Sequence, residues 1–258
     1  TKGDVIVVTE RRVRDWDEHL GHLDASEATY TVGWIDATAS GAGLGRGILE
    51  EAETGAGLVA RANRNRRVPM DAPAMALSPA VVRSFNAAYW RKVPARGRTS
   101  VKPIEDFFFP LDKIHDWNRL YGKHGFHQFQ CVVPLAAAPA LRAMLEEIAR
   151  SGLASPLAVL KRMGAGRAGM MSFPMEGYTL AVDLHGARGP ETLVARLVAM
   201  TREAQGRIYL AKDSLAGGED VRAMYPERAR WSKEVAKVDP DGVMATDLIR
   251  RLDLRNLT

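Results

Sequence analysis

The stretch FHQFQCVVPLAAAPALRAMLEEIARSG, residues 126–152, decides the fold of this chain. Its first eight residues alternate between the two faces in the manner of a strand. Between Pro139 and Arg150 the apolar residues return every three or four positions, which is typical of an amphipathic helix; they are Leu141, Met144, Leu145 and Ile148. Ser151 and Gly152 are residue types that end helices. The stretch therefore predicts a strand followed by a helix.

The residues that follow complete a recognisable order of elements. Residues 157–162 and 178–184 predict two strands, Pro190 opens a helix that stops near Gly206, and residues 207–210 predict a short strand. Strand, helix, strand, strand, helix, strand is the split βαβ, ferredoxin-like pattern. We therefore expect an α+β fold, an antiparallel sheet flanked by helices.

The N-terminal half is less regular. Strands are expected at residues 4–8, 30–37 and 48–53, and helices at 15–23 and 81–88, the second capped by Ser78 with Pro79 in its first turn. Two basic segments, residues 60–79 and 94–102, predict loops with few apolar anchors. We expect both loops to be mobile when no ligand is bound.

Composition limits the function classes. The chain has 258 residues, 46% hydrophobic and 26% charged, which is ordinary for a globular protein, and no apolar run approaches the length of a membrane span. The single cysteine, Cys131, excludes a disulfide framework and a cysteine-based zinc site, and no metal is expected. A cytoplasmic location is the default. The net charge of +5 is spread along the chain, so it favours anionic partners without indicating nucleic acid.

Two motifs invite a functional interpretation. The segment GAGLGRG, residues 41–47, has neither dinucleotide-motif nor P-loop spacing and does not open a helix, so we interpret it as a plain loop. The arginine cluster Arg61, Arg64, Arg66 and Arg67 is either a solvated loop, or an attractor for a phosphate-bearing substrate or an anionic membrane surface. Of the six histidines, only His127, beside Gln128, stands out.

Three segments carry a resemblance to a known family. They are FFFPLDKIHDWNRLYGKHGFHQFQCVVP at 107–134, LAVLKRMG at 157–164 with MSFPMEGYTLAVDL at 171–184, and GRIYLAKDS at 206–214 followed by MYPERARW at 224–231 and VDPDGVMATDLIRRLDL at 238–254. Together, in this order and spacing, they resemble decaprenylphosphoryl-ribose oxidases, and YTVGWIDA at 30–37 matches more loosely. The resemblance runs nearly from end to end.

The resemblance implies a domain organisation. This family is of the vanillyl-alcohol-oxidase type, in which an FAD-binding domain is followed by a cap domain that covers the flavin. It implies that residues 1–214 are the substrate-binding cap domain and residues 215–258 a helical tail that would pack on the FAD domain. We expect the FAD domain to precede Thr1, so that this chain alone should bind FAD poorly.

The resemblance also implies site residues. The substrate-binding candidates are Trp34, Phe108, Leu111, Gln128, Gln130, Lys161, Thr179 and Ala181, and the residues nearest the flavin are Tyr209 and Lys212. Gln128 and Gln130 alternate, so both face one side of the sheet, and their amides suit sugar hydroxyls. Lys161 lies on an apolar strand, where a charge should have a partner.

Three positions depart from the family pattern. Thr179 and Ala181 stand where the mycobacterial oxidases have asparagine and cysteine, and Phe108 replaces a tyrosine. A thiol in that strand is therefore not required for the chemistry. The departures bear on the identity of the substrate more than on the class of reaction.

The implied function is FAD-dependent oxidation of a sugar or polyol hydroxyl by hydride transfer to the flavin. The 2-position of decaprenylphosphoryl-ribose is the first substrate expected, and a small alditol or another phospho-sugar the second. Lys212 is the expected catalytic residue, either as a fixed ammonium or as a neutral base; an ion pair with Asp213 is the structural alternative. A non-catalytic ligand- or protein-binding module is the alternative from another class.

Overall fold

The split βαβ unit is present as predicted. In the computed structural model, which describes residues 5–58, 64–166, 169–186 and 189–255, it consists of β7 (Phe126–Val133), α4 (Ala138–Ser151), β8 (Ala154–Met163), β9 (Gly177–His185), α5 (Glu191–Glu203) and β10 (Arg207–Ile208). The strands lie in the order β10-β7-β9-β8, so β9 runs between β7 and β8 and antiparallel to both. The α+β class with an antiparallel sheet is confirmed.

The sheet continues beyond this unit. Strand β8 pairs with β2 (Tyr30–Ile35), and the order goes on through β3 (Gly47–Gly55) and β1 (Val5–Val13) to β5 (Arg98–Pro103), which makes eight strands within the described residues. Each neighbouring pair is antiparallel. Both halves of the chain therefore build one sheet, and its two edge strands, β5 and β10, come from different halves of the sequence.

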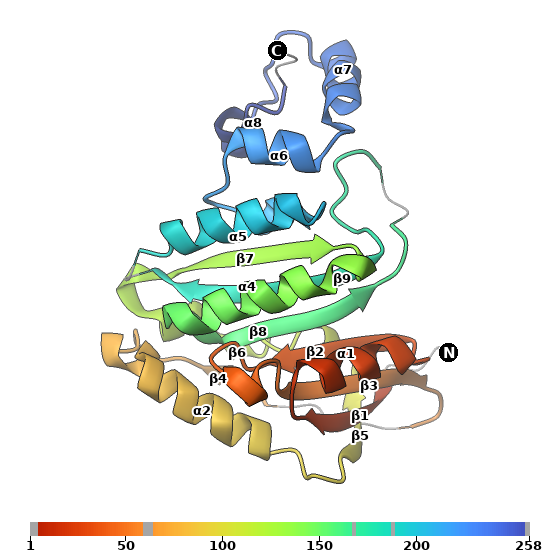
Figure 1. Cartoon of the computed structure of the whole chain (residues 1–258), viewed down its shortest axis with the longest axis vertical. Coiled ribbons are helices and arrows are strands. Elements are labelled where there is room, and N and C mark those ends of the chain that lie inside the picture. Colours follow the sequence, from red (N-terminus) through yellow and green to blue (C-terminus); the bar gives the residue numbers. More distant parts are fainter. Residues whose placement is uncertain (1–4, 59–63, 167–168, 187–188, 256–258) are drawn as a thin grey trace.

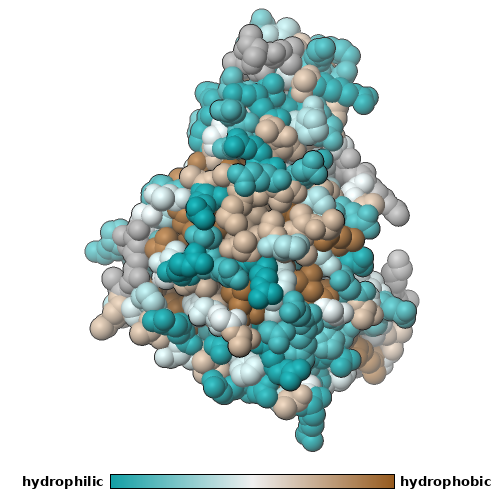
Figure 2. Space-filling view, viewed as in Figure 1, coloured by the Kyte–Doolittle hydropathy of each residue, from teal (hydrophilic) through white to brown (hydrophobic). Residues whose placement is uncertain are grey.

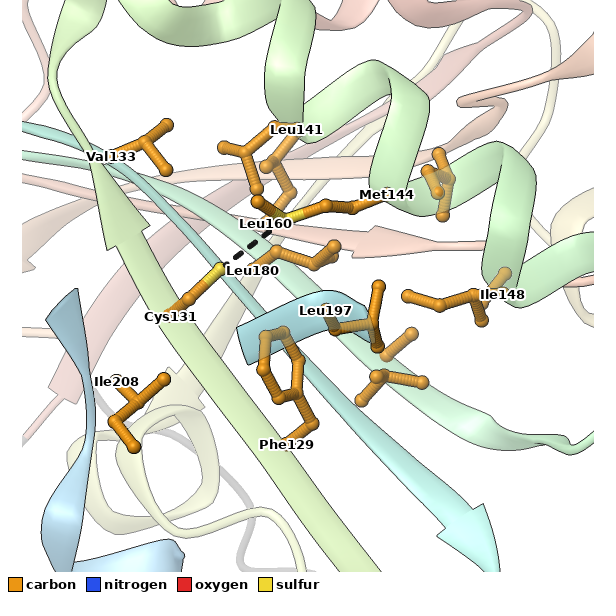
Figure 3. Packing of buried hydrophobic residues seen from close by; sticks show 14 of the residues in the cluster. Phe129, Cys131, Val133, Leu141, Met144, Ile148, Leu160, Leu180, Leu197 and Ile208 are labelled. Carbon is orange, nitrogen blue, oxygen red and sulfur yellow. Dashed lines mark hydrogen bonds between the residues drawn. The ribbon is translucent and has the colours of Figure 1, made fainter. Parts of the chain in front are cut away.

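Helices α1 (Trp16–Ala25), α4 and α5 cover one face of this sheet (Figure 1). The predicted stripe of α4, Leu141, Met144, Leu145 and Ile148, is fully buried. In Figure 3, Leu141, Met144 and Ile148 face Cys131 and Leu180 of the sheet, and the Cys131 thiol lies 3.9 Å from the Met144 sulfur. Burying an aliphatic side chain of this size contributes about 2 kcal/mol, so this face holds the main core.

The opposite face is covered only in part, by segments that connect the two halves of the chain. Helix α2 (Pro79–Arg91) begins at the predicted Pro79, and α3 (Ile104–Phe108) lies over β1 and β3, where Phe107 packs against Ile6, Val8 and Ala52. Further short elements are η1 (Gly41–Gly43), η2 (Ala74–Leu77), η3 (Trp117–His124), η4 (Leu135–Ala137), and the two-stranded pair β4 (Arg66–Arg67) and β6 (Ile114–His115). We call this second side of the sheet the open face.

Three expectations about the N-terminal half need comment. Residues 94–102, predicted as a loop, instead include most of the edge strand β5, whose Arg98 and Lys102 pair with carboxylates on β1 and on β3 beyond it. The strand predicted at residues 4–8 extends to Val13, while Asp4 lies outside the described residues. The loop predicted at residues 60–79 contains β4 and η2, and Arg61 also lies outside the described residues.

The glycine-rich segment is the loop that was predicted, between β2 and β3. Gly45 has φ of +83°, and a Cβ there would lie 2.5 Å from the Cα of Trp16. The Arg46 guanidinium pairs with the buried Asp36 carboxylate at 2.7 Å. The glycine is thus needed for the close approach of α1, a structural role.

The C-terminal tail consists of α6 (Gly218–Met224), α7 (Arg228–Val238) and α8 (Asp247–Leu252). Val221, Tyr225 and Leu252 belong to the same core as α5, and the Tyr225 hydroxyl donates a hydrogen bond to the Ile208 carbonyl at 2.6 Å. The outer surface of the tail is largely hydrophilic (Figure 2). Within the described residues, no helix is both long and apolar enough to cross a bilayer.

Candidate functional site

Strands β7, β9 and β8 bring four of the predicted residues together on the open face. Gln130 lies directly opposite Ala181, and Ala181 lies opposite Val159. Directly paired residues of an antiparallel sheet share a face. Gln128 and Thr179, which alternate with these positions, therefore share the open face too.

Both glutamine amides have partners within the sheet. The Gln130 Nε2 donates to the Thr179 hydroxyl at 3.2 Å, and the Gln128 Nε2 donates to the Asp183 carboxylate at 2.6 Å. Asp183 is fully buried, and sequence reasoning missed it. The alternation of strand residues could have indicated Asp183. Thr179 and Ala181 were predicted site residues, and Asp183 is the next residue of β9 on the same face.

Asp183 is held from a second direction by Tyr121 of η3. The Tyr121 hydroxyl donates to the Asp183 Oδ2 at 2.6 Å and lies 3.3 Å from the Ser155 hydroxyl. Burial raises the pKa of Asp183, while the hydrogen bonds from Tyr121 and Gln128 and the charge of Lys212 lower it. Burial prevails, so the pKa of Asp183 is raised. The site therefore contains a fixed carboxyl group beneath its polar surface.

Lys161 and Lys212 are the cations of this region. Burial of part of each side chain lowers the pKa of both lysines; the Lys212 charge lowers that of Lys161 further, and Asp183 opposes the shift of Lys212. The expectation that Lys161 has a partner was wrong: among the described residues no carboxylate lies within 4.0 Å of either ammonium. Asp213, the alternative partner of Lys212, pairs with Arg251 at 2.6 Å instead.

A cavity of about 270 Å³ opens between β2, β8 and α3. Its lining joins aromatic rings, hydroxyls and two cationic side chains; the residues are Thr29, Tyr30, Thr31, Val32, Phe107, Phe108, Lys161 and Arg162. The rings of Tyr30 and Phe108 meet edge to face at 5.0 Å. The predicted residues Phe108 and Lys161 therefore meet in one cavity, which combines apolar walls with positive charge.

The remaining predicted residues lie in other surroundings. Tyr209 borders a small depression with Gln128 and Gln130, and its ring packs on Phe173 at 4.7 Å. The Trp34 indole donates to the Pro156 carbonyl at 2.8 Å, which holds the ring within the sheet surface. Leu111 lies in the turn after α3. Neither Trp34 nor Leu111 lines the cavity or the depression.

The arginines of the cluster that the structure describes differ in their contacts. Arg67 pairs with Asp116 at 3.0 Å, which ties β4 to the residue after β6. Arg64 and Arg66 are exposed. Arg64 and Arg66 therefore keep positive charge at the surface.

The chemistry of the open face suits one part of FAD better than the other. Ammonium groups without carboxylate partners, such as those of Lys161 and Lys212, are suitable neighbours for the carbonyl oxygens of an isoalloxazine ring. A diphosphate is typically bound at a helix N-terminus that follows a glycine-rich turn. The glycine-rich segment of this chain, residues 41–47, instead packs closely against α1 through Gly45. Within the described residues, no group of three or more His, Cys, Asp or Glu side chains could hold a metal ion.

Comparison with known proteins confirms the resemblance. The chain is 35% identical over 246 residues to decaprenylphosphoryl-β-D-ribose oxidase of Mycolicibacterium smegmatis (strain ATCC 700084 / mc(2)155), covering 90% of this chain and 53% of that protein. It is 28% identical over 271 residues to an uncharacterised protein in the mprA 5′ region of Streptomyces coelicolor, covering 97% of this chain and 73% of that protein. The chain thus spans about half the length of the oxidase it matches.

Solved structures agree on the fold. Cholesterol oxidase from B. sterolicum superposes with a TM-score of 0.53 at 10% identity, covering 96% of this chain and 59% of that one. FgChi7B superposes with a TM-score of 0.51 at 9% identity, covering 93% and 54%. At this identity the likeness concerns the fold alone, and it supports the antiparallel sheet with helices. No family model matches the chain.

Proposed function

We propose that the open face over β7, β9 and β8 is the substrate side of an FAD-dependent oxidoreductase that acts on a hydroxyl group of a sugar or polyol. The observation that carries this proposal is the pair Lys161 and Lys212, two cations without direct carboxylate partners beside the amides of Gln128 and Gln130. Lys161 also lines the cavity between β2, β8 and α3, and cations without carboxylate partners are typical of binding sites. The similarity to a protein named decaprenylphosphoryl-β-D-ribose oxidase agrees with it.

The substrate class follows from the cavity between β2, β8 and α3. Lys161 would attract a phosphate, and Arg162, which pairs with Asp24 at 3.2 Å, adds positive charge nearby. The rings of Tyr30 and Phe108 would accept an apolar chain, and the threonine hydroxyls would contact either. We therefore place decaprenylphosphoryl-ribose, or another lipid-linked phospho-sugar, first and a small alditol second. A cytoplasmic protein that meets an anionic membrane surface would suit such a substrate.

The chain's own residues have defined tasks in this reaction. When bound, FAD would accept the hydride that leaves the carbinol carbon. Gln128 and Gln130 would orient the sugar hydroxyls. Lys212 would either stabilise negative charge as an ammonium or, since burial lowers its pKa, accept the hydroxyl proton as a neutral amine. The carbinol then loses a proton from its oxygen and a hydride from its carbon, and a carbonyl remains.

Anaerobic reduction tests the proposal. The full natural protein is mixed without oxygen with a short-chain prenylphosphoryl ribose or with an alditol, and the visible absorbance of the flavin is followed. We expect bleaching by the phospho-sugar at a rate that saturates with its concentration. Tight binding of the sugar without bleaching would favour the non-catalytic binding module, and a protein without flavin would contradict the proposal.

A further inference from the structure

The contact between Asp183 and Gln128 decides which atoms Gln128 can offer to a ligand. The amide NH₂ of Gln128 donates to Asp183 Oδ1 at 2.6 Å, and the other carboxyl oxygen accepts from the Tyr121 hydroxyl, so both oxygens of Asp183 act as acceptors. The carbonyl oxygen of the same amide is then turned away from Asp183. Among the described residues nothing donates a hydrogen bond to it.

Asp183 itself has little freedom to move. Its other oxygen accepts from Tyr121 at 2.6 Å, and the Tyr121 ring packs on Phe126 with 4.2 Å between centroids. The carboxylate is fully buried between β7 and β8. A buried carboxyl group with two short hydrogen bonds fixes the positions of its partners and which of their atoms act as donors.

The neighbouring glutamine is oriented less firmly. The Gln130 amide contacts the hydroxyl of Thr179 at 3.2 Å, and a hydroxyl can either accept or donate. Gln130 can therefore turn its amide to suit a ligand, whereas Gln128 cannot. The two alternating glutamines differ in what they can recognise.

We infer that Asp183 is a specificity-determining positioning residue: by accepting from the Gln128 amide, it makes Gln128 present a hydrogen-bond acceptor, so that the site selects a ligand hydroxyl that donates. This inference rests on the proposed function for its ligand, and on Asp183 and Gln128 alone for its geometry. A ligand group that cannot donate would face an unpaired carbonyl oxygen. Such a mismatch costs roughly tenfold in affinity.

The test compares ligands that differ in one donated hydrogen bond. Short-chain prenylphosphoryl ribose and its 2-fluoro and 3-fluoro analogues, which are nearly the same size but cannot donate, are titrated calorimetrically into the full natural protein. We expect at least one fluoro analogue to bind about tenfold more weakly. In Asp183→Asn the side-chain amide can donate to Gln128 or accept from it, so this ratio should fall to about twofold or less.

A matched control separates this effect from the loss of any buried carboxylate. Asp36 is likewise fully buried and hydrogen-bonded, to Arg46 and to Asn86 at 2.7 Å each, but has no contact with the glutamines. Asp36→Asn should lower thermal stability and leave the tenfold ratio unchanged. A ratio in Asp183→Asn equal to that of the unmodified protein would overturn the inference.

A second measurement needs neither the ligand nor a folded Asp183 variant. In ¹⁵N spectra of the unmodified protein, the Gln128 side-chain amide, assigned by its disappearance in Gln128→Ala, should exchange its protons slowly. Rapid exchange would overturn the inference even if the sugar binds. Slow exchange without sugar binding would support the amide orientation while contradicting the proposed function, so the two failures are distinguishable.

Discussion

The open face has two halves that carry charge in opposite ways. Over β1, β3 and β5 both cations of β5 have carboxylate partners: Arg98 holds the buried Glu10 through two hydrogen bonds, and the Lys102 ammonium lies 3.5 Å from Glu50. Over β7, β9 and β8, Lys161 and Lys212 have no direct carboxylate partner among the described residues. One sheet thus presents a neutralised half and an unneutralised half.

The pKa shifts of Glu10 and Lys212 distinguish a charge that stabilises the fold from one that does not. Burial alone would raise the pKa of Glu10, but the hydrogen bonds and charge of Arg98 and the charge of Lys102 outweigh it, so the folded state favours the ionised form. Lys212 shows the opposite balance, since burial lowers its pKa and Asp183 compensates only in part. Glu10 therefore stabilises the fold, whereas Lys212 is held in the folded protein at a cost.

The largest effect is expected at Lys212. In the full natural protein, Lys212→Met should slow reduction of the flavin by the substrate about a hundredfold, the size of effect seen when one preorganised donor is removed. Its melting temperature should be unchanged or higher. Stopped-flow absorbance without oxygen measures the rate.

The arginine variant distinguishes the two roles of Lys212. Lys212→Arg keeps the charge but cannot act as a base, so partial recovery of the rate favours the electrostatic role. A near-normal rate of flavin reduction in Lys212→Met would show that Lys212 does not act in the reaction. The difference in charge pairing between the two halves of the open face would then not indicate the site.

A smaller effect, on stability, is expected at Glu10. Glu10→Gln breaks a pair whose carboxylate is buried but whose arginine is 44% exposed, so we expect a loss of about 2 kcal/mol in the free energy of unfolding, below the value for fully buried pairs. Substrate reduction of the flavin should stay normal. Glu51→Gln, which breaks the more exposed pair with Arg11, is the control and should cost less.

The effect of Glu10 should depend on pH in a defined direction. The folded state lowers the pKa of Glu10 below 4.5, so its stabilisation is complete above the pKa of the unfolded chain and is lost as pH falls through the folded pKa. Urea unfolding at neutral and acid pH should therefore show the difference between Glu10→Gln and the unmodified protein narrowing on acidification. A difference that grows at acid pH would contradict this.

The smallest effect is expected in the exposed arginine cluster. Replacing Arg64, Arg66 and Arg67 with serine should raise KM for a phospho-sugar about threefold at low salt and hardly at all at physiological salt, because salt screens exposed charges. Steady-state kinetics at two ionic strengths measure this. An unchanged KM at low salt would assign the cluster to the solvated surface.

The regular part of the fold could be predicted from the sequence because its signals are local. The alternation of β7 and the three-to-four spacing of α4 lie within 27 residues, and the α4 stripe is buried as expected. Strand β5 could not be predicted in this way. Its Arg98 and Lys102 suggest a solvated loop until Glu10 and Glu50, far earlier in the chain, are placed beside them.

Several residues of the candidate site could be predicted from the sequence, but the hydrogen bonds among them could not. The family resemblance indicated Gln128, Gln130, Lys161 and Lys212, and the sheet places the two glutamines on one face. That Asp183 orients Gln128 depends on Tyr121 and on the register of three strands, which the local pattern does not contain. The missing partner of Lys161 could likewise be recognised only once its surroundings were known.

The central claim is that the unneutralised half of the open face binds the substrate. Its most direct test is a crystal structure of the full natural protein with a non-reactive fluoro analogue of prenylphosphoryl ribose. We expect the sugar over β7, β9 and β8, with a polar atom within about 3.2 Å of the Lys212 ammonium and of the Gln128 carbonyl oxygen. A sugar bound over β1, β3 and β5, or away from the open face, would contradict the account.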